Sequence, residues 1–95
     1  MYQRTHLKVK RIVIYSMQIR AARALLGIGQ AELAKMAGVG VGTIKRMESP
    51  EAEITGSIGT LVRITRACEN AGVVFIDDNG VHGPGVRLRQ PLQRE

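Results

Sequence analysis

Apolar side chains recur every three or four residues in four successive stretches of this 95-residue chain, which places them on one face of a helix. The spacing predicts helices over residues 17–26, 30–37, 41–48 and 57–71. The side chains expected to face the core are Ile19, Ala22, Leu25, Leu26, Leu33, Ala34, Ala37, Ile44, Met47, Ile58, Leu61, Ile64, Cys68 and Ala71. The pattern predicts a small helical bundle.

The second and third predicted helices are separated by a short segment that contains Gly38. A helix that must reverse direction this sharply ends in a left-handed conformation, which glycine adopts without a steric penalty. Ala34, one turn earlier, is small enough to let two helices cross closely. Helix, tight glycine turn and helix together form the arrangement of a helix-turn-helix.

After residue 72 the period of the apolar residues changes from helical to alternating. Val73–Ile76 forms a short apolar run, an Asp-Asp-Asn-Gly turn sequence follows, and Val86 and Leu88 then alternate with arginines. We expect a β-hairpin over residues 73–89 with an irregular return, and a frayed tail over 90–95. Because a lone hairpin is marginally stable, it must pack on the helices, pair with the N-terminal segment or pair with a second subunit.

Residues 1–16 precede the first helix and contain the β-branched, basic stretch Lys8–Tyr15. This stretch predicts an edge strand or a dimer arm. Its lysines and arginine equally suit a flexible basic arm that lies along phosphates.

The composition favours a nucleic-acid partner, because the formal net charge is +6 and the pI is near 10.3. Aromatic residues make up 3% of the chain, too few for the stacking on which single-strand recognition depends, so a duplex is expected. The single cysteine, Cys68, cannot form an internal disulfide, and no apolar run approaches the ~20 residues of a membrane span. We expect a cytoplasmic protein with no membrane partner.

Enzyme chemistry and metal binding are not expected from this sequence. His6 and His82 stand alone, without the ligand spacing of a metal site. No nucleophile and base can be paired, and the glycines between Gly38 and Gly42 follow a helix rather than a strand, unlike a dinucleotide-binding fingerprint. No cofactor is predicted.

The residues around the glycine turn resemble the helix-turn-helix of phage repressor and Cro-type (XRE-family) transcriptional regulators. The landmarks are Ala34, Gly38, Ile44 and Met47, within RALLGIGQAELAKMAGV and TIKRMES. The resemblance covers residues 17–72 and implies a mainly α, lambda-repressor-like bundle of four to five helices, here with a C-terminal hairpin and a possible N-terminal strand. It also implies a homodimeric regulator that inserts its third helix in the major groove of duplex DNA.

The same resemblance suggests which side chains meet DNA. Base readers in the family occupy positions that correspond here to Val41, Gly42 and Arg46, and Arg46 suits a bidentate contact with guanine. Thr43 and Lys45 can reach backbone or bases, and Gln30 at the start of the second helix matches a phosphate-binding glutamine. The outward arginines of the first helix, Arg20 and Arg23, are expected to hold phosphates. Glu48 matches a structural glutamate of the family, expected to form a cap or a salt bridge.

Two features depart from a strong base reader and leave a second function open. Val41 and Gly42 offer little hydrogen bonding, and Glu51 and Glu53 place negative charge in a loop that contacts phosphates in the family. The alternative is a helix-turn-helix module that binds a protein and sequesters or antagonises another regulator, in the manner of an antiactivator. Its docking surface would be the region of Val39, Val41 and Met47, or the hairpin edge.

Overall fold

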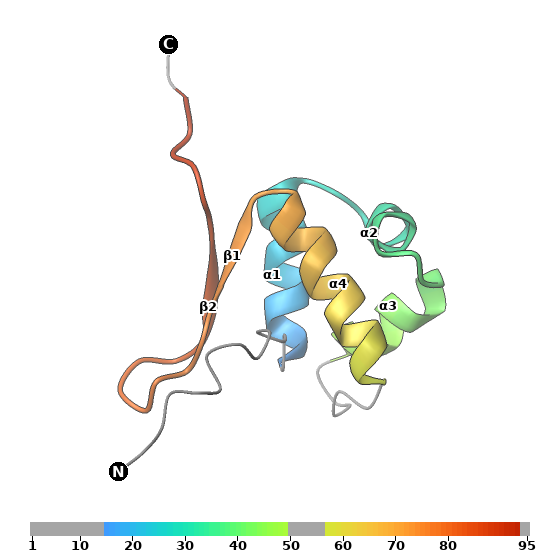
Figure 1. Cartoon of the computed structure of the whole chain (residues 1–95), viewed down its shortest axis with the longest axis horizontal. Helices are drawn as coiled ribbons and strands as arrows, with labels where there is room; N and C mark the ends of the chain where they lie inside the picture. The colour runs from blue at the N-terminus through green and yellow to red at the C-terminus, as the bar shows by residue number, and fades with distance from the viewer. Residues whose placement is uncertain (1–14, 50–56, 94–95) are drawn as a thin grey trace.

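The computed structural model describes residues 15–49 and 57–93 as four helices followed by two strands (Figure 1). The elements are α1 (Ser16–Leu26), α2 (Gln30–Ala37), α3 (Val41–Glu48), α4 (Ile58–Asn70), β1 (Val73–Ile76) and β2 (Gly85–Leu88). This arrangement confirms the predicted mainly helical fold with a C-terminal hairpin. The predicted N-terminal strand, except for Tyr15, and the acidic loop residues Glu51 and Glu53 lie outside the described residues.

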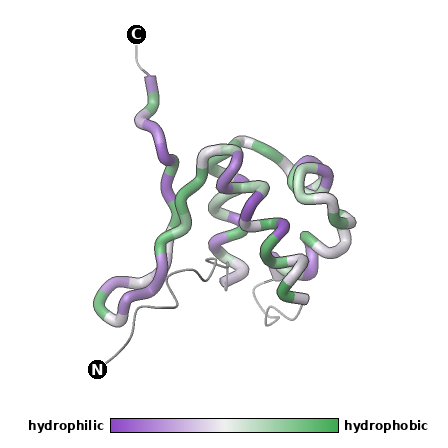
Figure 2. Tube along the Cα trace, viewed as in Figure 1, coloured by the Kyte–Doolittle hydropathy of each residue, from purple (hydrophilic) through white to green (hydrophobic). Residues whose placement is uncertain are grey.

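The helices enclose one core, and the hairpin closes its open side (Figure 1). α2 packs on α3 and α4, α1 packs on α3, and the hairpin lies against α1 and α4. β1 is hydrophobic along its length, whereas hydrophobic and hydrophilic residues alternate along α4 (Figure 2). Buried apolar residues from every helix and β1 make up the core: Ile19, Ala22, Leu33, Ala34, Ala37, Ile44, Met47, Leu61, Ile64, Ala67, Cys68, Val73 and Phe75.

The turn between α2 and α3 has the predicted geometry. Gly38 has φ 72° and ψ 35°, the left-handed conformation that ends α2. The backbone N–H of Val39 reaches back to the carbonyl of Ala34 at 3.0 Å, and that of Gly38 reaches Lys35 at 3.3 Å. These two hydrogen bonds satisfy carbonyls at the helix end, so the turn is short and closely defined.

β1 and β2 pair in antiparallel register, with Val73 opposite Leu88 and Phe75 opposite Val86. Val73 and Phe75 are buried, and Val86 packs against the same core. The loop between the strands is organised by Asn79, whose Oδ1 accepts hydrogen bonds from the backbone N–H groups of Val81 and His82. The hairpin therefore has the irregular return that the sequence predicted.

A buried glutamine joins α1 to this hairpin. Gln18 is 4% exposed, and its Nε2 donates to the carbonyl of Ile76 at 3.2 Å and to that of Gly85 at 3.1 Å. Ile76 and Gly85 are directly paired, so one amide group bonds both strands at the end of the ladder. The role was not predicted, although Gln18 lies one turn before the buried Ala22 on the same helix face.

Three side chains predicted to be buried are exposed. Leu25, in the last turn of α1, is exposed, whereas the next residue, Leu26, packs against the core. Ile58 is the first residue of α4 and is 67% exposed. α4 ends at Asn70, so Ala71 is a capping residue beyond the helical stripe. In each case the residue lies at a helix end, where the neighbouring elements no longer cover the apolar face.

Candidate nucleic-acid interface

α3 divides cleanly into a buried and an exposed side. Ile44, Met47 and Glu48 are buried, whereas the predicted readers lie on the opposite side. The exposed residues are Val41, Gly42, Lys45 and Arg46, with Thr43 half-buried beside them. All five residues predicted to meet bases or backbone from this helix are thus brought together on one accessible surface.

The side chain of Arg46 contacts another residue of α3. Its Nη2 donates to Thr43 Oγ1 at 3.4 Å, one turn away, a long contact on an exposed surface. The guanidinium therefore lies over the outward side of α3 and is bonded to no acidic group in the described part of the chain. It remains available to an external acceptor.

The N-termini of α2 and α3 carry uncapped backbone groups. Gly29 and Gly40 occupy the N-cap positions, and neither helix has a side-chain hydrogen bond to its first amides. A helix start without a side-chain cap presents N–H donors and the positive end of the helix dipole. In a basic protein, both ends are suited to an anion.

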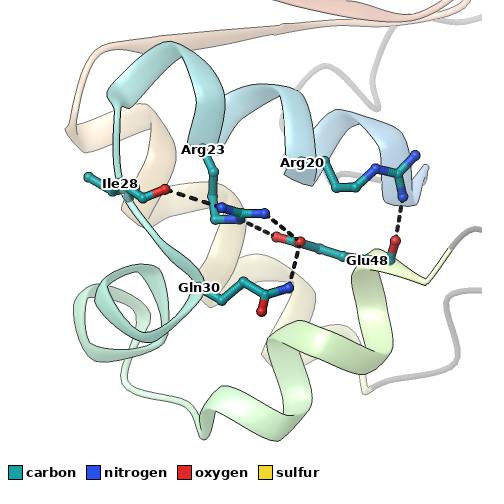
Figure 3. A network of polar contacts seen from close by, with 5 residues as sticks. All are labelled: Arg20, Arg23, Ile28, Gln30 and Glu48. Atoms are coloured by element: carbon teal, nitrogen blue, oxygen red, sulfur yellow. Dashed lines mark hydrogen bonds and ion pairs between the residues drawn. The ribbon is translucent and has the colours of Figure 1, made fainter.

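A hydrogen-bonded network around Glu48 ties three helices together (Figure 3). Arg23 from α1 bonds both oxygens of the carboxylate with one edge of its guanidinium: Nε lies 2.6 Å from Oε2 and Nη2 lies 2.9 Å from Oε1. Gln30 from α2 donates its Nε2 to the same Oε1 at 2.9 Å. Arg20 donates to the backbone carbonyl of Glu48, and a further nitrogen of Arg23 donates to the carbonyl of Ile28. The predicted salt-bridge role of Glu48 is confirmed.

The network keeps Glu48 ionised although its side chain is only 4% exposed. Burial alone would raise the pKa of the carboxyl, but the hydrogen bonds from Arg23 and Gln30 outweigh burial and lower it. The same hydrogen bond raises the pKa of Arg23. Both partners are therefore charged at neutral pH.

Stability is expected to fall at acid pH because of Glu48. Since the folded-state pKa of this carboxyl lies below its ordinary value, the contribution is complete above that ordinary value and is lost as pH falls through the lowered pKa. Melting temperatures measured from pH 7 to about pH 3 are expected to decline more steeply for the wild type than for Glu48→Gln. Parallel declines would show that other carboxyls carry the acid sensitivity.

The structure gathers Arg20, Arg23 and Gln30, the residues predicted to hold phosphates, around Glu48. The two arginines were expected to face outward, but both are half-buried. The exposed Arg63 of α4 donates its Nη1 to the carbonyl of Gly38 at 3.3 Å. The contact could not be predicted from the spacing of residues in the sequence, because it depends on how α4 crosses the turn between α2 and α3.

Two other residues considered in the sequence analysis, Met47 and Cys68, are buried in the core. Met47 is 4% exposed, so it cannot form part of the docking surface predicted with Val39 and Val41. Cys68 is fully buried, and burial, with smaller contributions from Glu69 and Glu48, raises the pKa of its thiol to about 11. A thiol that remains protonated and covered is unreactive, as expected for a structural cysteine.

The helical part of the chain matches the sequence model of a known family. The sequence model of the family described as Helix-turn-helix matches residues 19–69, more than half of the chain, from the first turn of α1 to the last turn of α4. A search of curated proteins gives no match. Among the described residues, no helix is long and apolar enough to cross a lipid bilayer.

Proposed function

This chain belongs to the XRE-type helix-turn-helix family of DNA-binding regulators, and we propose that it reads duplex sequence by placing α3 in the major groove. The observation that carries the proposal is the exposed side of α3, where Arg46, Lys45 and Val41 stand clear of the core. Arg46 would bond guanine O6 and N7 together, and Val41 would touch a thymine methyl group. Thr43, Lys45 and the backbone at Gly42 would complete the contact.

Phosphate binding would come from the start of α2. Gln30 is its first residue, and the preceding Gly29 leaves the helix amides open to an anion. Arg20 would contribute positive charge near this point, because it donates only to the backbone carbonyl of Glu48, whereas the charge of Arg23 is paired with the Glu48 carboxylate. Residues 17–72 would form the DNA-binding unit, with the hairpin packed on it.

We further propose that the protein acts as a homodimer on a two-fold site. Family dimers place two recognition helices about one turn of DNA apart, roughly 34 Å. The net charge of +6 favours contact of each subunit with the phosphates of the DNA.

Substitutions on α3 and α2 are expected to divide into two classes. Arg46→Ala is expected to weaken binding to the specific site by about 1–3 kcal/mol while leaving random-sequence binding nearly intact, because a bidentate base contact is lost. Gln30→Ala is expected to weaken binding to all sequences alike, because phosphates carry no sequence information. Titrations of each variant against a selected site and a random duplex measure both effects.

The contrast between the two variants is the test, because a general loss of charge would affect both DNAs equally. Lys35→Ala supplies the control, since this exposed lysine lies in the last turn of α2, away from the first-turn Gln30. An Arg46→Ala variant with unchanged affinity for every duplex would contradict base reading by α3.

The alternative function, a protein-binding module that antagonises another regulator, is favoured by one observation. Met36 is 42% exposed and Val41 is 39% exposed, so two apolar side chains lie open on the helix-turn-helix itself. Mobility shifts on random duplex DNA at two salt concentrations separate the functions. A phosphate binder loses affinity steeply as salt rises, whereas a protein-binding module gives no shift at either concentration.

A further inference from the structure

We propose that Glu48 and Arg23 are positioning residues for DNA binding: together they orient the side-chain amide of Gln30 so that it can bond a phosphate. The inference rests on the proposed phosphate contact of Gln30. Arg23 would then not bind a phosphate directly, in contrast to the role expected from the sequence. The pair acts through Gln30, while Gln30 itself meets the DNA.

The orientation of the Gln30 amide is set by its partner. Figure 3 shows the nitrogen directed at Glu48 and the oxygen directed away from it. An ionised carboxylate can only accept hydrogen bonds, so it selects the NH₂ group and rejects the amide oxygen. Of the two amide hydrogens, Glu48 takes one, and no acceptor among the described residues bonds the second. A freely rotating amide would present its oxygen to a phosphate as readily as its nitrogen.

Arg23 makes this arrangement compatible with DNA. A bare carboxylate beside the phosphate-binding end of α2 would repel the anion. Here the guanidinium bonds both oxygens of Glu48, so the group that holds Gln30 is an ion pair with no net charge. The pair thus supplies the acceptor that fixes Gln30 without placing an uncompensated negative charge next to the DNA.

The three side chains come from three helices, which fixes the amide relative to the whole fold. Arg23 lies on α1, Gln30 on α2 and Glu48 on α3. The guanidinium of Arg23 is itself held by the carbonyl of Ile28, and Arg20 bonds the backbone of Glu48. Gln30 is therefore bonded to a carboxylate whose position is fixed by Arg23 at the side chain and by Arg20 at the backbone.

The experiment replaces the pair without changing net charge. The Arg23→Met/Glu48→Met variant removes one positive and one negative side chain, and apolar replacement of a buried pair usually preserves folding, which a thermal melt verifies. Affinity for a random-sequence duplex at low salt is measured for this full-length variant, for Gln30→Ala and for the combination. Arg66→Met/Glu69→Met on α4 is the matched control, since it makes the same two changes in side chains that form no hydrogen bond in the network around Glu48.

The pair variant and Gln30→Ala are each expected to bind the duplex about tenfold more weakly than the wild type, because each loses one hydrogen bond to a charged phosphate. The combination is expected to bind no more weakly than Gln30→Ala, because the pair acts through that residue. The control is expected to bind like the wild type. A pair variant that weakens binding equally with and without Gln30 would have a merely structural role, and this would overturn the inference. Unchanged affinity in the pair variant would overturn it as well.

Failure of the proposed function gives a different result. If the wild type does not bind any duplex, or if Gln30→Ala binds like the wild type, the phosphate contact itself is absent and the inference falls with it. If Gln30→Ala weakens binding while the pair variant does not, the function stands and only the positioning role is overturned.

Discussion

Glu48→Ala is expected to lower the free energy of unfolding by about 3 kcal/mol, at the lower end of what breaking a buried ion pair costs. The substitution leaves Arg23, whose side chain is 21% exposed, without its acceptor, and it removes the acceptor of Gln30. Partial exposure of Arg23 lets water replace some of the lost interaction, which keeps the effect from being larger. Denaturant unfolding at neutral pH measures it.

The double substitution Arg23→Met/Glu48→Met separates the loss of the pair from the creation of an unpaired charge. It is expected to recover most of the stability that Glu48→Ala loses, because neither charge is left buried alone. Equal destabilisation of the single and double variants would show that packing around Glu48, rather than its charge, holds the three helices together.

Gly38→Val is expected to cost about 1–3 kcal/mol, the range for a residue forced into a sparsely populated backbone conformation. No atom crowds the position of a Cβ at Gly38, so the expected penalty comes from the backbone alone. A β-branched side chain is strained at φ 72°, and the hydrogen bond from Val39 to Ala34 allows the turn little adjustment. Thermal melts of the variant and the wild type give the comparison.

Two further variants make that test specific. Gly38→Asn is expected to be milder, because asparagine tolerates the left-handed region. Gly42→Ala is expected to raise stability by up to about 1 kcal/mol, since Gly42 is a helical residue with open space around its Cβ position. A Gly38→Val protein that melts with the wild type would mean that Gly38 is not held in this conformation in solution.

The bounds of α2 and α3 could be predicted from sequence because glycines flank these helices. Gly29, Gly38 and Gly40 mark where each helix begins or ends, and the apolar spacing between them is short and regular. Which side chains are buried at helix ends was predicted less well, as the exposure of Leu25 and Ile58 shows. Periodicity identifies the face of a helix, but how far along the helix that face is covered depends on tertiary packing.

The candidate site divides in the same way. The exposed side of α3 follows from helical geometry, so its residues could be placed in advance. The salt-bridge role of Glu48 could be expected from the family, but its partners could not. Arg23 and Gln30 meet that carboxylate from two different helices, and which long side chains meet across helices is set by crossing geometry that no sequence spacing encodes.

The amide of Gln18 has a consequence for how the molecule opens. Because it bonds both Ile76 and Gly85 and is anchored on the first turn of α1, the strands cannot separate at that end without breaking at least one of the two hydrogen bonds. A solvent-shielded amide that loses its partners costs free energy, so partial detachment of the hairpin is disfavoured. Amide hydrogens of β1 and β2 would then exchange with solvent in the same cooperative unit as those of α1, although the strands and the helix are far apart in the chain.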